Sequence, residues 1–198
     1  NIAVSLVLKC ISILVSLQVV PLTIGYVNPT KYGIWLTLSS IIAWLSYFDL
    51  GFAHGFRNRF AEAKAKGDMK LAKEYVSTTY AVLFLLFSVI LLITLVVNNY
   101  LDWSRILNIN AVYKDELSLV FGLLACFFCL NIVASVFTTM LTAAQKPALA
   151  SLIQTGGQVL AFVCIYILTK TTQGSLSALA FAFSAIPCLF LLIVSIIV

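Results

Sequence analysis

The chain has 198 residues, of which 62% are hydrophobic and only 10% are charged, and its mean hydropathy is +1.09. A soluble domain of this length would carry far more charge on its surface, so the composition excludes that class and predicts an integral membrane protein. The net charge of +5 does not indicate nucleic-acid binding, because half of the twelve Lys and Arg residues lie in one segment, Arg57 to Lys73, which has a membrane explanation.

Six apolar stretches are long enough to cross a bilayer, which takes about 20 helical residues. We place these helices at about 2–26, 31–57, 75–98, 116–143, 147–169 and 175–198. Pro, Gly, Asn or charged residues separate them, as expected of loops. The predicted fold class is all-α, a polytopic membrane helix bundle of six transmembrane helices. Because the chain begins without Met and ends within an apolar run, we expect residues 1–198 to be a fragment of a longer protein.

The distribution of Lys and Arg among the loops predicts the orientation. The loops after the second and fourth predicted helices carry seven of these residues, and the loops after the first, third and fifth carry four. Cytoplasmic loops are enriched in Lys and Arg, so the N-terminus and the end of the sixth helix are predicted to be cytoplasmic. The polar loop 98–115 then faces outward, where Tyr100 and Trp103 suit the aromatic belt at the membrane interface.

Three predicted helices carry polar side chains along one face at helical spacing. In chain order these residues are Ser5, Lys9, Ser12, Ser16 and Thr23 on the first, Asn131, Ser135, Thr138, Thr142 and Gln145 on the fourth, and Ser151, Gln154 and Gln158 on the fifth. Small hydroxyl residues at this spacing often only pack helices together in lipid. The larger polar side chains of Lys9, Asn131, Gln154 and Gln158 favour a hydrated cavity instead. Gly156 and Gly157 are the expected flexible point of the fifth helix.

One carboxylate, Asp49, lies inside the predicted second helix. The first two helices are antiparallel neighbours, so Asp49 is expected at a depth similar to that of Lys9. The two residues form either a structural ion pair or part of a switch, a substrate path or a proton path, and both interpretations stay open. His54 is the only histidine, so a metal site is not expected. Gly51 and Gly55 form a GxxxG motif that allows a neighbouring helix to approach closely.

The segment 57–74 carries six bases and three acids. As a topology anchor it would lie against anionic lipid headgroups. Arg57, Asn58 and Arg59 at its start also suit an anionic headgroup such as a diphosphate, because Arg binds phosphate oxygens bidentately. Composition alone leaves both explanations open.

Several motifs together resemble those of a known membrane-protein family. They are Val20-Pro21-Leu22-Thr23, the run Asn28 to Ser40, Phe48-Asp49-Leu50-Gly51, Gly55-Phe56-Arg57-Asn58, the run Tyr75 to Tyr80 and the run Leu141 to Ser151. With these motifs the chain resembles the N-terminal half of bacterial O-antigen flippases, the oligosaccharide-exporter type of polysaccharide-biosynthesis protein. That type belongs to the same superfamily as the multidrug exporters and the lipid II flippase. The run Phe52-Ala53-His54 departs from the family pattern, which has a smaller or more polar run there.

The resemblance implies two six-helix lobes around a central cavity, of which this chain is the first, in the bacterial cytoplasmic (inner) membrane. The implied activity is to flip a polyprenyl-diphosphate-linked oligosaccharide to the outer leaflet by alternating access, for surface polysaccharide such as the O-antigen of lipopolysaccharide. The implied partners are this lipid-linked oligosaccharide, membrane lipids and other glycan-assembly proteins, with no nucleic acid. No cofactor or metal is expected, and coupling to a proton or sodium gradient stays open.

The residues singled out fall into two groups. The candidate cavity residues are Lys9, Ser12, Ser16, Asp49, Arg57, Asn58, Arg59, Asn131, Thr138, Gln154 and Gln158. The candidate packing or hinge residues are Pro21, Gly51, Gly55, Gly156 and Gly157.

Two alternatives to a flippase remain. An ion-coupled multidrug or cation antiporter of the same superfamily would favour acids in its cavity, whereas Asp49 is the only intramembrane acid of the predicted helices. A non-transporting scaffold of a glycan-assembly complex would need no polar interior. An enzyme is not expected, because the sequence offers no nucleophile–base–acid set, no metal cluster and no phosphate-binding glycine loop.

Overall fold

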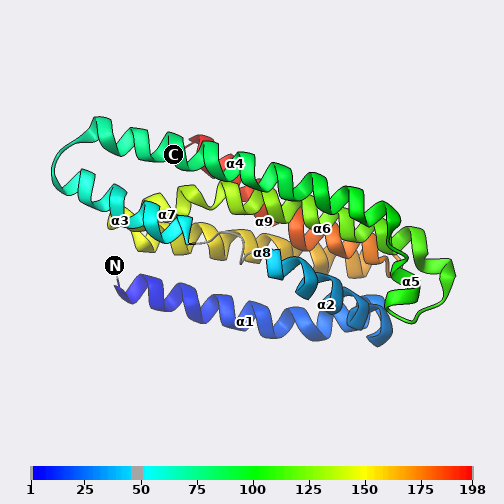
Figure 1. Ribbon diagram of the computed structural model, residues 1–198. Coiled ribbons are helices and arrows are strands. Elements are labelled where there is room, and N and C mark those ends of the chain that lie inside the picture. The colour runs from blue at the N-terminus through cyan, green and yellow to red at the C-terminus, as the bar shows by residue number, and fades with distance from the viewer. Residues whose placement is uncertain (1, 46–50, 198) are drawn as a thin grey trace.

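The computed structural model describes residues 2–45 and 51–197, and every regular element in these two ranges is a helix (Figure 1). Five helical segments in the described ranges are long and apolar enough to cross a membrane. They are Ala3–Val27, Met69–Tyr100, Lys114–Ala143, Pro147–Thr171 and Leu176–Ile197. The prediction of an all-α fold is therefore confirmed for the described ranges, which contain five candidate spans where six transmembrane helices were predicted.

The second predicted helix differs most from the structure. Helix α1 (Ile2–Val27) is followed by α2 (Pro29–Trp44). Asn28 caps the start of α2, because its side chain accepts a hydrogen bond from the Lys31 amide at 3.0 Å. Helix α3 (Phe52–Ala65) is separate and follows Gly51, which has a left-handed backbone with φ of 79°. A single helix over 31–57 is wrong, because a residue in this conformation cannot continue a right-handed helix.

The charged segment 57–74, which was predicted to lie between two spans, is helical on both sides of a turn. Gly67, with φ of 75°, forms this turn, and α4 (Met69–Tyr100) begins directly after Asp68. The Asp68 side chain accepts a hydrogen bond from the Leu71 amide at 2.9 Å, which caps α4. The third predicted helix therefore begins at Met69 and not at 75. Lys70, Lys73 and Glu74 lie on its first turns.

The remaining predicted helices agree with the structure, with one interruption. Two short helices, α5 (Trp103–Ile106) and the 3-10 helix η2 (Ala111–Tyr113), occupy the predicted polar loop. The fourth predicted helix is divided at Ser135 into α6 (Lys114–Ala134) and α7 (Val136–Ala143). The fifth and sixth are α8 (Pro147–Thr171) and α9 (Leu176–Ile197).

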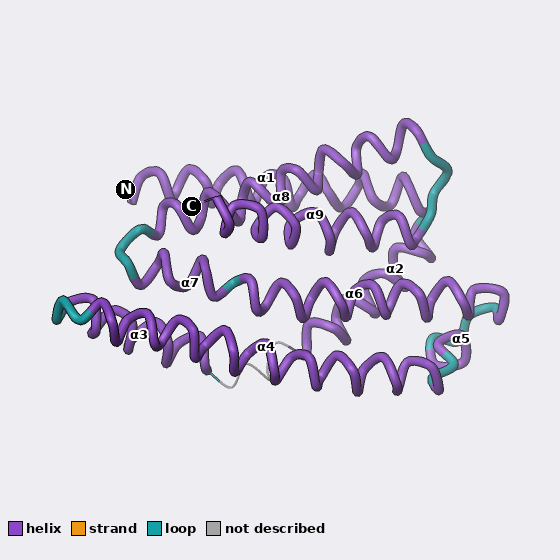
Figure 2. The backbone as a smooth tube through the Cα atoms, turned by 90° about the horizontal axis from the view of Figure 1, so that it is seen from above, coloured by secondary structure: helices purple, strands orange, loops and turns teal. Residues whose placement is uncertain are grey.

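The long helices lie side by side in one bundle (Figures 1 and 2). Helix α8 packs between α1 and α9, and α6 packs between α9 and α4. Helix α2 contacts α1, α6 and α9, and α3 packs on α4 and α7. One end of the bundle, here called the basic end, carries the start of α1, the turn between α3 and α4, the connection 144–146 and the end of α9. The opposite end, here called the loop end, carries Asn28, residues 101–113 and residues 172–175.

The buried core sits mainly between α2, α6, α8 and α9. Leu38, Val120 and Leu179 are each 0% exposed at its centre. Helix α1 contributes far less to this core, since apolar side chains such as Leu6 and Leu14 point away from the bundle and are exposed. Such a face suits contact with lipid rather than with water.

Candidate functional site

A cavity with several polar residues in its wall, here called the α1–α8 cavity, has a volume of about 450 Å³ and lies between α1, α2, α8 and α9. Ser16 on α1, Tyr32 on α2 and Gln158 on α8 contribute polar groups to its wall. Trp35 on α2 and Phe183 on α9 contribute aromatic rings. The cavity therefore combines a mostly apolar wall with a few hydrogen-bonding groups, which is typical of ligand-binding sites.

Two of the predicted polar faces meet at this cavity. The Ser12 hydroxyl on α1 donates a hydrogen bond to Gln158 Oε1 on α8. The Ser16 hydroxyl donates to the Ser12 carbonyl at 2.9 Å, so the serine that lines the cavity is also held against its own helix. Three of the candidate cavity residues are thus placed together, on two helices that are far apart in the sequence.

A second cavity, here called the α2–α6 pocket, has a volume of about 220 Å³ and lies between α2, α6 and α9. Asn131 on α6, Ser39 on α2 and Ser184 on α9 are its polar residues. Trp35 and Phe183 line both cavities, and their ring centroids are 5.0 Å apart. Asn131 therefore does not join Gln158 in one site but faces a neighbouring pocket across this aromatic pair.

Other candidate cavity residues lie outside both cavities. Thr138 is buried, and its hydroxyl donates to the Ser135 carbonyl at 2.9 Å, which is a packing role. Gln154 on α8 and Lys9 on α1 are exposed, and neither lines one of the two cavities. Asp49 lies outside the residues that the structure describes, so the proposed pairing with Lys9 remains a prediction.

The basic residues at the start of the charged segment lie on the outer face of α3. Phe56, Phe60 and Ala63 of this helix are buried against the bundle, which leaves Arg57, Asn58 and Arg59 exposed. The spacing of the buried residues explains this orientation, because they recur on one side of a helix.

The bases of α3 and of its C-terminal end are not equivalent. Lys66 donates a hydrogen bond to Glu62 at 2.7 Å, and Arg59 lies 3.9 Å from the same carboxylate. The hydrogen bond and the positive charge of Lys66 hold the pKa of Glu62 below its ordinary value, and the same contact raises the pKa of Lys66. Both side chains are thus ionised at neutral pH and partly neutralise each other. Within the described ranges Arg57 makes no such ion pair, which leaves its guanidinium available to an external anion.

The candidate hinge glycines of α8 act in packing. Helix α8 runs without interruption through Gly156 and Gly157. A Cβ atom on Gly157 would lie 3.2 Å from Pro187 Cα, and one on Gly156 would lie 3.0 Å from the ring of Phe190. These glycines let α9 approach α8 closely, and the expected flexible point is not observed.

The remaining hinge candidates have different surroundings. Pro21 lies within α1, which continues through it. Gly51 precedes α3 in its left-handed conformation, so its role is in the turn. In the described part of the chain nothing approaches within 4 Å of a Cβ placed on Gly51 or Gly55. The close helix contact expected from the GxxxG motif is therefore absent there.

A hydrogen-bonded cluster at the loop end was not anticipated from the sequence. Trp103 is only 3% exposed, and its indole N–H donates to Asn98 Oδ1 at 2.6 Å. The Asn98 amide donates in turn to the carbonyl and hydroxyl oxygens of Ser118, at 3.0 and 3.1 Å. The expectation that Trp103 belongs to an interfacial aromatic belt is wrong, because tertiary packing against Phe121 buries it. Tyr100, at 85% exposed, is placed as a belt residue would be.

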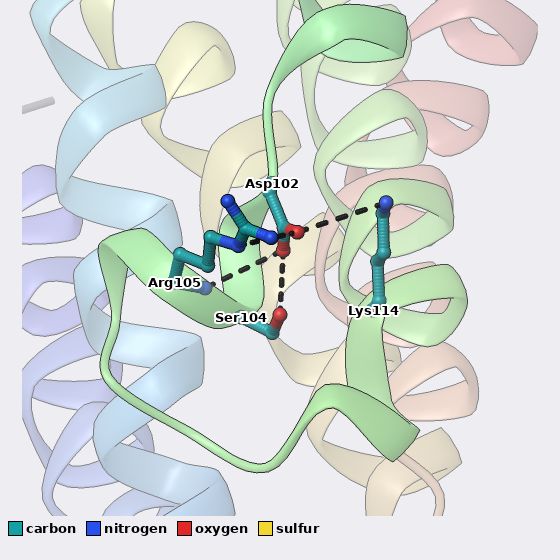
Figure 3. A network of polar contacts seen from close by, with 4 residues as sticks. All are labelled: Asp102, Ser104, Arg105 and Lys114. Atoms are coloured by element: carbon teal, nitrogen blue, oxygen red, sulfur yellow. Dashed lines mark hydrogen bonds and ion pairs between the residues drawn. The ribbon is translucent and has the colours of Figure 1, made fainter.

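Asp102 organises the adjoining loop (Figure 3). Its carboxylate accepts a hydrogen bond from the Ser104 hydroxyl at 2.5 Å and lies 3.4 Å from Arg105 Nε and 3.7 Å from Lys114 Nζ. These contacts, the Ser104 hydrogen bond first among them, hold the pKa of Asp102 below its ordinary value. The acid therefore has a structural role at the loop end.

Polar contacts also join the helix connections at the loop end. The hydroxyls of Tyr26 and Thr172 lie 2.8 Å apart, and Lys31 Nζ donates to the Gly174 carbonyl at 3.4 Å. A Cβ atom on Gly174 would lie 2.1 Å from the Tyr26 carbonyl oxygen, so only glycine fits there. These contacts join segments more than a hundred residues apart, and no local sequence pattern indicates them.

Sequence reasoning also missed the residues that divide the two cavities, Trp35, Phe183 and Pro187. One available signal was Pro187, because a proline within a helix removes the N–H that would pair with the carbonyl four residues earlier. In a membrane such an interruption often marks a cavity.

No protein-family model, no curated protein and no solved structure matches the chain.

Proposed function

We propose that the protein is a transporter that flips a polyprenyl-diphosphate-linked oligosaccharide from the cytoplasmic to the outer leaflet of the bacterial inner membrane by alternating access. The observation that carries this proposal is the combination of an uncharged, hydrogen-bonding α1–α8 cavity with an exposed basic hairpin at one end of the bundle. A lipid-linked oligosaccharide has the matching chemistry, with neutral sugars joined to an anionic diphosphate.

The basic hairpin, formed by α3, the Gly67 turn and the start of α4, suits the cytoplasmic membrane surface. It carries six Lys and Arg residues, and Lys146 lies at the same end of the bundle. The positive-inside rule places this end, and with it the start of α1, in the cytoplasm. Arg57 would then meet a diphosphate headgroup where the substrate enters.

The lining of the cavities favours the flippase over a cation antiporter. Every residue that lines the α1–α8 cavity or the α2–α6 pocket is uncharged. A cationic drug would be stabilised by carboxylates at such a site, whereas sugar hydroxyls need only neutral donors and acceptors. The polar cavities also weigh against a non-transporting scaffold, which has no use for them.

The test is deletion of the gene followed by complementation. Deletion is expected to remove surface glycan and to leave lipid-linked glycan on the cytoplasmic leaflet, and the unaltered gene is expected to restore export. Unchanged surface glycan together with altered drug sensitivity would contradict the proposal and favour the antiporter.

Two double variants separate headgroup binding from topology. Arg57→Lys with Arg59→Lys keeps the charge that orients the protein but loses the planar fork that binds phosphate bidentately. We expect about a tenfold loss of export, from roughly 1.4 kcal/mol of weaker phosphate contacts. Lys64→Arg with Lys70→Arg, a matched change of base on the same hairpin, is expected to retain export. Equal export by both double variants would assign the hairpin to topology alone.

A further inference from the structure

The α2–α6 pocket contains polar groups that the protein itself does not satisfy. The Ser39 hydroxyl oxygen is buried, and no partner lies within hydrogen-bonding distance in the part of the chain that the structure describes. In the same ranges no hydrogen bond reaches the Asn131 side-chain amide, which lines the same pocket. Because buried polar groups are almost always paired, the Ser39 hydroxyl indicates a missing hydrogen-bonding occupant. The Asn131 side chain is exposed, and its amide is available to the same occupant.

A third polar group adjoins them on α9. Pro187 lines the pocket and has no N–H, so the Phe183 carbonyl lacks its usual helical donor. The Ser184 hydroxyl already donates to the Ala180 carbonyl at 2.6 Å and is left as an acceptor. The pocket therefore offers both donors and acceptors from three different helices.

The rest of the wall is aromatic and uncharged. Trp35, Phe127, Phe128 and Phe183 all line the pocket, and no charged residue does. A metal cation would lack carboxylates and a phosphate group would lack bases, so the occupant is neutral.

Neither water alone nor a hydrocarbon chain fits this wall. About seven waters would fill about 220 Å³ at roughly 30 Å³ each. Each buried water needs two to four polar partners, and most of them would face aromatic rings. A hydrocarbon would fill the volume but leave Ser39 and Asn131 unpaired.

An amphipathic ring satisfies both parts of the wall. We propose that the α2–α6 pocket binds one uncharged sugar ring, with its C–H face against the aromatic side chains and its hydroxyls bonded to Asn131 and Ser39. The Asn131 amide both donates and accepts, so it can pair with two adjacent hydroxyls. This inference rests on the proposed function, because it makes the pocket a subsite for one residue of the transported oligosaccharide.

Saturation-transfer NMR on the intact protein in lipid nanodiscs tests the inference. The probes are the methyl β-glycosides of glucose, galactose and N-acetylglucosamine, with acyclic mannitol as a polyol that has no ring face. At least one glycoside is expected to receive saturation at its ring C–H protons, above empty nanodiscs and above mannitol.

Two variants locate the binding site. Asn131→Leu and the milder Ser39→Ala are each expected to weaken the transfer, with Asn131→Leu lowering it at least about fivefold through loss of two hydrogen bonds. Asn99→Leu is the matched control, since Asn99 is an exposed helical asparagine outside the pocket, and it is expected to leave the transfer unchanged. Transfer no stronger than in empty nanodiscs would mean that the pocket holds water only, and undiminished transfer in both pocket variants would place the sugar elsewhere. Either result overturns the inference.

The two proposals fail in different ways. If deletion of the gene leaves surface glycan unchanged but glycoside binding depends on Asn131, the sugar-binding inference is supported and the flippase proposal is contradicted. If the protein exports glycan but the Asn131→Leu and Ser39→Ala variants bind the glycosides as well as the unaltered protein does, only this inference is contradicted.

Discussion

Replacement of Asn98 by Ala removes the centre of the buried cluster at the loop end. The Trp103 N–H, in a side chain only 3% exposed, loses the acceptor that lies 2.6 Å away, and Ser118 loses two contacts from the amide. A buried donor without a partner costs about 1–3 kcal/mol. The Ser118 carbonyl still accepts a hydrogen bond within α6, so its loss of the Asn98 contact adds little. We therefore expect the free energy of unfolding to fall by about 2 kcal/mol in total. For a chain of this size, a loss of about 1 kcal/mol lowers the melting temperature by about 2–4 °C, so we expect a fall of about 4–8 °C.

Thermal unfolding in detergent micelles measures this loss, with Asn99→Ala as the control. Asn99 is exposed on the same helix, and its replacement is expected to change stability by no more than about 0.5 kcal/mol. Trp103→Phe removes the other partner, so the double variant is expected to lose less than the sum of the two single losses. Equal melting temperatures for the Asn98 and Asn99 variants, or fully additive losses in the double variant, would refute the reasoning.

Three further predictions follow from the same structure. Gly174→Ala is expected to lower the melting temperature, because its Cβ would meet a backbone oxygen at 2.1 Å, whereas Gly33→Ala, with nothing within 4 Å of its Cβ, is expected to be neutral or to stabilise α2. Gln158→Leu is expected to reduce glycan export at normal membrane abundance, whereas Gln154→Leu, outside both cavities, is expected to retain it; equal export would exclude Gln158 from the path. Asp102 has a lowered pKa when folded, so it stabilises the fold above its unfolded pKa of about 3.9, and this contribution is lost as pH falls through the folded value. Melting between pH 6 and pH 3 checks this, and Asp102→Asn is expected to flatten the profile.

Helix existence could be predicted from the sequence because hydrophobic length is a local property. The α8 and α9 boundaries followed from Pro147 and from the polar run before Leu176. The separation of α2 from α3 was missed because a glycine such as Gly51 can serve either in helix packing or in a turn. Its φ of 79° identifies the turn, and this angle cannot be predicted from the sequence pattern. Apolar composition continues across that position, so hydropathy gives no sign of the break.

Side-chain faces could be predicted, but their partners could not. The periodic spacing placed Ser12, Gln158 and Asn131 on polar faces, and the first two do meet. Asn131 faces a different cavity because α9 brings Phe183 against Trp35 between them. That arrangement depends on the order in which the helices pack, and periodicity within one helix contains no information about it.

The two ends of the bundle are held together in different ways. At the loop end, polar contacts join separate connections, as between Tyr26 and Thr172 and between Lys31 and Gly174. At the basic end, the α3–α4 hairpin has local polar contacts, such as those of Glu62 with Lys66 and of Asp68 with the Leu71 amide. Local contacts resist unfolding of the hairpin but not its displacement as a unit, whereas contacts between distant segments resist both. The polar contacts between distant connections thus lie at the end remote from the exposed bases, whereas buried apolar side chains such as Phe56 and Phe60 hold the hairpin that we assign to substrate entry against α4 and α7.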